Sequence, residues 1–380
     1  MTIVPSHLYY LGGIKAKRIP AVLSATMAKA AKFHINDVVY IHNLQHLVKL
    51  SSVDKVYLDD IILRRKNEYE HYTVEKKSGG SRFISAPKED LKQLQRWINY
   101  YILRNLKPHP CCYSYHKNSS IYSCAMVHCS SQWLVKLDVE NFFDMTSERS
   151  VYEQFILIGY SPIVSFALAR ICTYQPKFLT KNHSKWVLYQ RKNRELAYSR
   201  NNIKYIGRLP QGAPTSPMLS NMVFFELDKI IYKLVQSHGG LYTRYADDLF
   251  ISFPKKDMNR FDISKIIGRV VDYLRKKGYS LNKTKIKVSP PGAKKIVLGL
   301  NVDKNIPHLS KEFKKSIDSH LYALSEFGPV AHARYRGFNS VYGMLEHIKG
   351  KILFAKTISH DYGLKCIQEF YAALEKHGFN

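Results

Sequence analysis

The sequence is poor in acidic residues and contains no long apolar run. Its 380 residues include 30 Asp and Glu against 58 Lys and Arg, which gives a formal net charge of +28. Self-repulsion on this scale is relieved by a polyanion, with nucleic acid as the first candidate and an anionic membrane surface as the second. Because no apolar run reaches the roughly 20 residues that span a bilayer, no membrane-spanning helix is expected.

Cysteine motifs and secretion signals are also missing. The 6 cysteines form no CxxC pair, which disfavours a structural zinc site, and a metal site between Cys111 and His128 is the weaker interpretation. Lys15, Lys17 and Arg18 interrupt the weakly apolar N-terminus, so it lacks the pattern of a signal peptide. Reduced thiols in a cytoplasmic protein fit this composition best.

The remaining composition is typical of a large globular protein. Hydrophobic residues make up 45% and charged residues 23% of the sequence, which is ordinary, and 380 residues can bury a large core in more than one lobe. The 27 tyrosines and 18 phenylalanines provide rings that could stack on bases. Most of these rings are nevertheless expected in the core.

The clearest chemical signal is a pair of adjacent acids in LYTRYADDLFISF, residues 241–253. Asp247 and Asp248 lie between two apolar runs that are rich in β-branched and aromatic residues. This pattern predicts a β-hairpin with the acids at its tip. Adjacent carboxylates repel each other unless a cation or hydrogen bonds neutralise them. A solvated turn is the alternative. The flanking hydrophobic strands argue against that alternative, but the dipeptide alone leaves a metal site and a solvated turn as equal interpretations.

A third acid follows another apolar strand, in QWLVKLDVENFFDM, residues 132–145. An acid at the end of a buried strand is costly unless it binds something, so Asp138 could join Asp247 and Asp248 if the two strands are neighbours. Three carboxylates can hold two divalent cations about 3.5–4 Å apart, which would activate a hydroxyl and stabilise a leaving pyrophosphate. Phe142 and Phe143 follow, either as the floor of a nucleotide pocket or as core residues.

Two further segments are basic. Residues 72–87 predict a hairpin with cations near its tip, where Lys76, Lys77 and Arg82 could clamp a triphosphate or form a solvated turn. Residues 175–208 contain nine cations, a single acid and interleaved aromatic residues. Such a segment suits a phosphate backbone with stacked bases, and a solvated surface insertion is the equal alternative.

The run LPQGAPTSPMLSN, residues 209–221, is rich in glycine, proline and small residues. It predicts a tight backbone turn against a ligand, with Gln211 at its start, followed by a helix over 218–235. Thr215 and Ser216 near the start of that helix would favour an anion. Helical periodicity also predicts helices in residues 1–70 and 150–174, directly after Pro87, and through most of the chain after residue 303.

Taken in chain order, these motifs resemble those of bacterial retron-type reverse transcriptases. The matching motifs are LDVENFF with Asp138, LPQGAPTSP with Gln211 and YTRYADD with Asp247 and Asp248. VEKKSGGSRFI, GYSLNKTKIKV (278–288) and IVLGL (296–300) add support over roughly residues 70–300. The resemblance implies an α+β right-hand polymerase. Its parts are an N-terminal helical region (1–70), fingers and a palm with an antiparallel sheet (71–300, with 175–208 as a basic insertion) and a helical thumb (301–380).

The resemblance also implies an activity and a set of site residues. The activity is RNA-directed DNA synthesis from dNTPs with two Mg²⁺ ions, for which Mn²⁺ is a possible substitute. The catalytic acids are Asp138, Asp247 and Asp248, and the metal ligands are these three with Val139. Phe143 is implied as the steric gate against a ribose 2′-hydroxyl. The residues implied in dNTP binding are Lys76, Lys77, Arg82, Phe143, Gln211 and Lys285.

Retron enzymes bind their own structured noncoding RNA and start DNA synthesis from a guanosine 2′-hydroxyl, leaving RNA-linked DNA. The resemblance therefore implies a noncoding RNA, its complementary DNA and a possible effector protein as partners, no membrane, and a role in anti-phage defence. The residues implied in RNA binding are His128, Arg191, Lys192, Arg194, Val297, Gly299 and Arg336.

Two motifs of the retron subgroup are altered in this chain. An Asn-Ala-x-x-His motif keeps Ala125 and His128 but has Cys124 first, and a Val-Thr-Gly motif has Leu298 in the middle. A phage-defence or intron-type relative therefore stays open. Two other functions also stay open, namely protein-primed or untemplated DNA synthesis and a noncatalytic RNA-binding scaffold.

Overall fold

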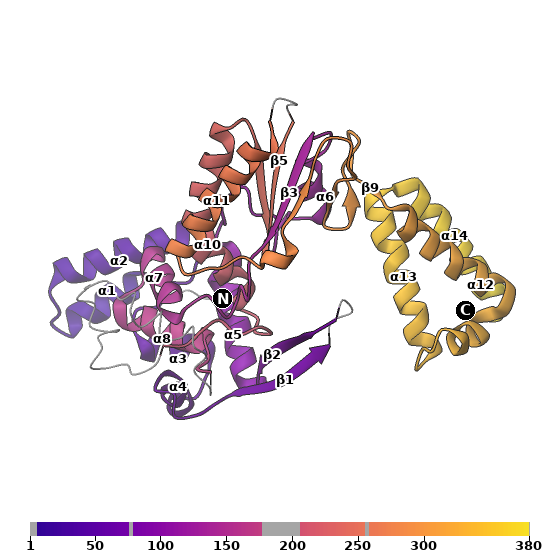
Figure 1. The fold of residues 1–380 in the computed structure, drawn as a ribbon. Helices are drawn as coiled ribbons and strands as arrows, with labels where there is room; N and C mark the ends of the chain where they lie inside the picture. The colour runs from indigo at the N-terminus through magenta and orange to yellow at the C-terminus, as the bar shows by residue number, and fades with distance from the viewer. Residues whose placement is uncertain (1–5, 76–78, 177–205, 255–257, 380) are drawn as a thin grey trace. The chain divides into compact units, whose positions relative to one another are not determined.

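The computed structural model describes residues 6–75, 79–176, 206–254 and 258–379 (Figure 1). These residues form two compact units, each assembled from segments that are distant in sequence. The first unit comprises the described parts of Met1–Asn118, Asp138–Ile231 and Ile267–Asn282, and the second those of Ser119–Leu137, Tyr232–Ile266 and Lys283–Asn380. The chain therefore crosses from one unit to the other inside β3, α10 and α11, whose bounds follow below.

The first unit begins with helices, as the periodicity of residues 1–70 predicts. They are α1 (Ser6–Lys15), α2 (Pro20–Ile35), α3 (Leu44–Ser51) and α4 (Lys55–Ile62). The Asn43 side chain caps α3 by accepting from the His46 N–H, and the Asp54 side chain caps α4 by accepting from the Tyr57 N–H. Leu47 and Leu58 are fully buried in the core that these helices share with the elements that follow.

The predicted basic hairpin is present and begins a few residues earlier than expected. Strands β1 (Tyr69–Glu75) and β2 (Ser81–Pro87) pair antiparallel, with Tyr72 opposite Ile84. Helix α5 (Glu89–Tyr101) and the short 3₁₀-helix η1 (Leu103–Asn105) follow, with Leu91, Leu94 and Ile98 on the buried face of α5. These buried apolar residues recur at spacings of three and four, which is the pattern of an amphipathic helix.

The helical character predicted over 150–174 is confirmed, and the structure divides the segment into two helices. Helix α7 (Glu148–Ile158) ends at Gly159, whose φ is 114°, and helix α8 (Pro162–Cys172) begins with a proline. Glycine adopts this left-handed backbone without strain, and proline suits the first turn of a helix, so the two residues together separate the helices. The helix predicted over 218–235 is confirmed as α10 (Ser216–Ser237).

The second unit contains a four-stranded sheet that bears the paired acids. Its strands are β3 (Trp133–Asp138), β4 (Leu241–Tyr245), β5 (Asp248–Phe253) and β6 (Lys287–Ser289), in the order β4-β5-β3-β6. β4 is antiparallel to β5 and β3 is antiparallel to β6. Helix α6 (Ile121–Met126) contacts β4, helix α11 is Arg260–Lys276, and the 3₁₀-helix η3 (Lys283–Lys285) precedes β6.

A small sheet and a helical bundle complete the second unit. Strands β7 (Ile296–Val297), β8 (Leu300–Asn301) and β9 (His308–Leu309) pair antiparallel. Helices α12 (Lys311–Tyr335), α13 (Val341–Ile358) and α14 (His360–Lys376) then pack side by side (Figure 1). Helix α12 is kinked at Gly328, whose φ of 76° precedes Pro329. The helical character expected after residue 303 is confirmed. Within the described residues, no helix combines the length and apolarity that crossing a membrane requires.

Candidate active site

The two adjacent acids lie at the end of a tight hairpin, as predicted. Tyr245 pairs with Asp248 across the β4–β5 ladder, which leaves Ala246 and Asp247 as a two-residue turn. Ala246 has a φ of 55°, a left-handed conformation that costs a residue with a side chain about 1–2 kcal/mol. Arg244, which is fully buried, donates from Nη1 to the Ala246 carbonyl oxygen at 3.1 Å and so helps to hold this turn.

Asp248 is paired with a cation from the neighbouring strand. The Lys136 Nζ lies 2.9 Å from Oδ1 and 2.9 Å from Oδ2 of Asp248, and the two side chains are 34% and 19% exposed. Lys136 stands two positions before Asp138 on β3, so the two residues belong to the same face of that strand. Asp138 is 7% exposed. The strand order, with β3 beside β5, is the neighbour relation that the sequence-based hypothesis required.

The chemistry of the donors suits a hard cation. Asp247 and Asp248 offer only carboxylate oxygens, and an ammonium group already contacts both oxygens of Asp248. Among the described residues, no group of three or more His, Cys, Asp or Glu is placed to hold a metal ion. The convergence of Asp138 with the paired acids therefore stays a prediction, as does the ligand role of Val139, whose side chain is buried.

Two of the residues predicted to contact a dNTP lie together in the first unit. With the Gln211 amide oriented to satisfy both partners, its oxygen accepts from the Arg82 Nε at 3.3 Å and its nitrogen donates to the Phe83 carbonyl at 3.3 Å. The Ser85 N–H also donates to the Gln211 carbonyl at 2.8 Å. A Cβ at Gly212 would stand 3.0 Å from Ile84 Cγ2, so the loop passes closely over the hairpin.

The two consecutive phenylalanines after Asp138 differ in environment. Phe142 is 3% exposed and packs against Phe224 and Tyr279, with ring centroids 5.5 Å and 6.1 Å away, so it is a core residue. Phe143 is only partly buried and faces Tyr115 at 6.4 Å. Phe143 is therefore the one of these two rings that a substrate could reach.

A polar cluster follows the Phe143 position. Tyr174 donates from its hydroxyl to Asp144 at 2.9 Å. Burial raises the pKa of Asp144, while the Tyr174 hydrogen bond and the charge of Arg208 oppose that rise. Tyr174 and Arg208 also exchange both backbone hydrogen bonds, at 3.0 and 2.9 Å. The residues that flank the segment 177–205 are thus held together by the Tyr174–Arg208 pair.

A buried carboxylate reinforces this position. Glu148, which is fully buried, accepts from Arg64, Arg170, Thr173 and the Gly207 N–H. Burial alone would raise the pKa of Glu148, but the two guanidinium charges and the hydrogen bonds outweigh it and lower the pKa. This cluster, formed by Glu148 and its four partners, ties α7, α8 and the residues on both sides of the 177–205 segment together.

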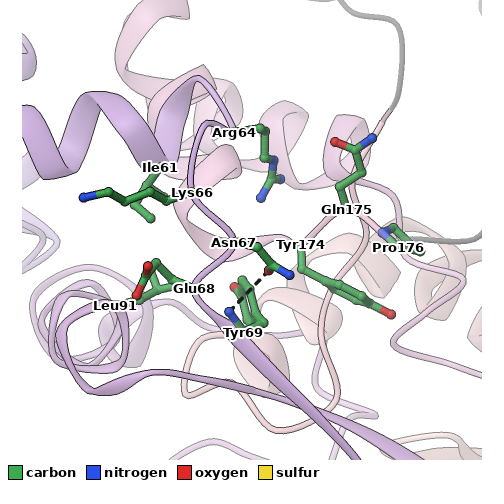
Figure 2. Close-up of a pocket in the computed structure, with 10 residues that line it drawn as sticks. All are labelled: Ile61, Arg64, Lys66, Asn67, Glu68, Tyr69, Leu91, Tyr174, Gln175 and Pro176. Atoms are coloured by element: carbon green, nitrogen blue, oxygen red, sulfur yellow. Dashed lines mark hydrogen bonds between the residues drawn. The ribbon is translucent and has the colours of Figure 1, made fainter.

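A cavity of about 260 Å³ lies beside this cluster. Figure 2 shows Arg64, Asn67, Tyr69 and Tyr174 around its centre, with the Asn67 side chain accepting from the Tyr69 N–H at 3.4 Å. The cavity is lined by residues of both charges, the basic Arg64 and Lys66 and the acidic Glu68. No local sequence pattern predicts this cavity, because its lining comes from three separate segments.

The residues predicted to bind RNA are placed differently from one another. His128 is fully buried and hydrogen-bonds to Ser252 Oγ and Thr243 Oγ1, each at 2.7 Å, and burial lowers its pKa to about 3. Val297 is also fully buried. In this arrangement neither side chain is available to RNA. His128, which lies just after α6, instead links that part of the chain to β4 and β5. An RNA contact by either residue stays a prediction.

Other predicted residues are exposed or lie outside the described residues. Gly299 and Leu298 form the β7–β8 turn, with φ values of 85° and 50°, and Arg336 is exposed at the end of α12. Lys285 is exposed on η3. Lys76, Lys77, Arg191, Lys192 and Arg194 lie outside the described residues. Thr215 and Ser216 are buried, at 0% and 1% exposure, so the anion site suggested there is not open to solvent.

Lys136 and Arg244 are site residues that the sequence analysis missed. Lys136 interrupts the apolar strand WLVKLD, and Arg244 interrupts LYTRYA. A cation within an otherwise apolar strand needs a partner. That signal was available in the sequence for both residues.

The comparisons with known proteins agree with these motifs. Residues 74–302 match the family model described as reverse transcriptase (RNA-dependent DNA polymerase). The chain is 26% identical over 341 residues to the retron Ec86 reverse transcriptase of Escherichia coli, covering 89% of this chain and 92% of that protein. It is 29% identical over 245 residues to the retron Mx162 reverse transcriptase of Myxococcus xanthus, covering 62% of this chain and 47% of that protein, so it spans about half of the latter's length.

A solved structure is also similar at low level. It is the telomerase of Candida albicans in complex with the TWJ fragment of telomeric RNA, with 11% identity, 85% of this chain and 58% of that chain covered, and a TM-score of 0.43. A similarity this low does not establish a shared fold. The family match covers more than half of this chain, and the mixed helices and antiparallel sheets fit the predicted α+β right-hand polymerase fold. The chain belongs to the reverse transcriptase family and is an RNA-directed DNA polymerase of retron type.

Proposed function

We propose that this enzyme copies part of a cognate structured noncoding RNA into single-stranded DNA that stays linked to the RNA. The retron relatives and the net charge of +28 support this proposal. We also propose that the product serves anti-phage defence in the cytoplasm, with an effector protein as a further partner. The noncoding RNA, its DNA copy and dNTPs are the partners that follow.

The active site in this proposal is formed by Asp138, Asp247 and Asp248. Two divalent ions, Mg²⁺ by the all-oxygen donor set and Mn²⁺ as a substitute, supply activation of the attacking hydroxyl and neutralisation of the leaving pyrophosphate when bound. The three carboxylates and the Val139 carbonyl hold these ions. The observation that carries this proposal is the position of Asp248 at the start of β5, beside the strand that ends at Asp138.

The incoming nucleotide contacts residues from separate elements. Arg82 and Gln211 are adjacent in the structure, which supports a shared contact with the dNTP. Arg82, Lys76 and Lys77 bind the triphosphate, and Lys285 supplies a proton to the pyrophosphate. Positioning and charge neutralisation account for most of the rate enhancement in phosphoryl transfer.

Primer extension with purified protein tests the catalytic assignment. We expect Asp247→Asn to lose at least about a thousandfold in DNA synthesis on an RNA template, because a neutral amide cannot replace a metal-binding carboxylate. Lys287→Met, on the neighbouring strand β6, is the matched control and should retain activity. Equal incorporation by Asp247→Asn and wild type would overturn the catalytic assignment, whereas no incorporation by wild type would favour the noncatalytic RNA-binding scaffold.

Sequencing of the nucleic acid that copurifies with the protein tests the substrate. A defined noncoding RNA joined to its complementary DNA supports the proposal. Homopolymeric DNA attached to a protein side chain would instead show untemplated, protein-primed synthesis.

In the proposed site, Phe143 selects against ribonucleotides. Because it is the partly exposed ring of the Phe142–Phe143 pair, Phe143→Val should open space for a 2′-hydroxyl. We expect the ratio of ribonucleotide to deoxyribonucleotide kcat/KM to rise about tenfold to a hundredfold. Single-nucleotide incorporation kinetics measure this ratio. Phe142→Val, which changes the core ring, should lower stability without raising the ratio, and a rise in both variants would contradict the assignment.

A further inference from the structure

Lys136 is an unusual residue for its strand. Within β3, whose six residues are all described, the other five are buried, and Lys136 alone is partly exposed. Its ammonium group contacts both oxygens of Asp248 at 2.9 Å and lies 5.6 Å from the ring centroid of Phe250. Asp248 and Phe250 belong to the same face of β5, so the Lys136 side chain reaches across that face.

A second lysine lies on the other side of Lys136. In the β3–β6 ladder, Lys136 is directly opposite Lys287, which is exposed. Directly opposed side chains of an antiparallel pair share a face, and like charges there repel each other. Because Lys287 is exposed, this repulsion is screened and weak. The attraction to Asp248 therefore places the Lys136 ammonium on the side of β3 that borders β5.

We propose that Lys136 is a positioning residue that holds the Asp248 carboxylate while the site contains no divalent ion and competes with the ion for that carboxylate. This inference rests on the proposed function, because it requires Asp248 to bind a metal. The adjacent carboxylates of Asp247 and Asp248 repel each other when no cation is present. An ammonium group on Asp248 relieves this repulsion and keeps the turn formed.

The choice of lysine over arginine follows from the same role. Lysine carries a compact charge on a flexible stem and can withdraw when a metal arrives, whereas a guanidinium group binds a carboxylate through two parallel hydrogen bonds. Lys136→Arg should therefore compete more strongly with the ion. Lys136→Met, which keeps the apolar stem, should not compete. Metal affinity is thus expected in the order Met, Lys, Arg, from tightest to weakest.

The test uses the full-length protein without nucleic acid or nucleotide. Electron paramagnetic resonance of free Mn²⁺ gives the binding curve, and the part that Asp247→Asn removes defines the site. Thermal unfolding in EDTA gives the stability of the metal-free protein. We expect Lys136→Met to bind Mn²⁺ at least about fivefold more tightly than wild type, because a cation near the site opposes a divalent charge. Its Tm should fall in EDTA and recover with Mn²⁺.

Two variants keep this test decisive. Lys136→Arg retains the charge and the fold, and should bind Mn²⁺ at least about threefold more weakly than wild type. Lys287→Met removes a lysine from the same face and should stay within about twofold of wild type, because a separated, exposed charge is screened. Equal Mn²⁺ affinity for Lys136→Met, Lys136→Arg and Lys287→Met would overturn the inference.

The failure of this inference differs from a failure of the proposed function. If wild type synthesises DNA and binds Mn²⁺ at the site that Asp247→Asn abolishes, equal affinities among the lysine variants overturn only the role of Lys136. If wild type neither binds Mn²⁺ at that site nor extends a primer, both proposals are overturned.

Discussion

At the residue scale, buried polar side chains explain how the sheet that bears the acids is held in place. His128 bridges Thr243 on β4 and Ser252 on β5 through its two ring nitrogens. Cys124 Sγ lies 3.2 Å from the same Thr243 hydroxyl. Both side chains come from α6 or the residues just after it. Cys124 and His128, the first and last residues of the altered motif, therefore support the β4–β5 hairpin here.

The burial of His128 makes stability depend on pH. Burial lowers its pKa to about 3 in the folded protein, whereas the unfolded chain has the ordinary value near 6.5. Between these values the unfolded state binds the additional proton, so stability falls as the pH falls from 6.5 toward 3. We expect a loss of about 1–2 kcal/mol from this ring between pH 6.5 and pH 5. Urea unfolding at several pH values measures this change.

A variant isolates the contribution of this histidine from that of others. Burial also lowers the pKa of His320, to about 4, so the wild-type slope contains more than one ring. His128→Gln can keep hydrogen bonds but has no proton to gain in this range. It should be less stable than wild type at pH 7 and lose less stability on acidification. Parallel pH profiles for the two proteins would show that His128 does not contribute.

At the element scale, the two ends of the basic segment are held together where it joins the first unit. Tyr174 and Arg208 exchange backbone hydrogen bonds, and Glu148 accepts from groups on both sides of the segment. Replacement of residues 177–205 by a short Gly-Ser linker should therefore leave the fold intact. A shorter loop costs less closure entropy, by about 0.6 kcal/mol per halving of length. We expect a free energy of unfolding equal to that of wild type or slightly higher.

Glu148, which accepts hydrogen bonds from both sides of the segment, provides the comparison variant. Glu148→Gln leaves Arg64 and Arg170 buried without their common carboxylate. We expect this variant to lose about 3–5 kcal/mol of stability. Urea unfolding of both variants distinguishes the contribution of the segment to stability from that of the Glu148 cluster. A large loss on replacement of the segment would show that residues 177–205 contribute to the core.

The motif-bearing elements could be predicted from the sequence, whereas their tertiary partners could not. The β4–β5 hairpin follows from alternating apolar residues and a two-residue turn, which are local signals. The contact between Lys136 and Asp248 depends on the pairing of strands more than a hundred residues apart, which no local pattern specifies. The break between α7 and α8 had a local signal in Gly159 and Pro162, but the apolar periodicity continues across it.

At the scale of the whole molecule, the charge of +28 predicts strongly salt-dependent RNA binding. Each phosphate contact releases counterions and adds about 0.7 to 0.9 to the slope of log K against log salt. Residues 177–205 contribute eight lysines and arginines and a single acid. We expect their replacement by a linker to make the slope shallower by at least about 2. Filter binding at several salt concentrations measures both slopes. Identical slopes would show that this segment does not contact the RNA backbone.

The hydrogen bonds between the β1–β2 hairpin and the loop that begins at Gln211 have a mechanical consequence. The Ser85 N–H donates to the backbone carbonyl of Gln211, and the Gln211 side-chain amide bonds to Arg82 and Phe83. The hairpin is therefore hydrogen-bonded to the start of the loop at three points. If the proposed contact between Arg82 and a triphosphate displaces the hairpin, these hydrogen bonds transmit the displacement to the loop that begins at Gln211.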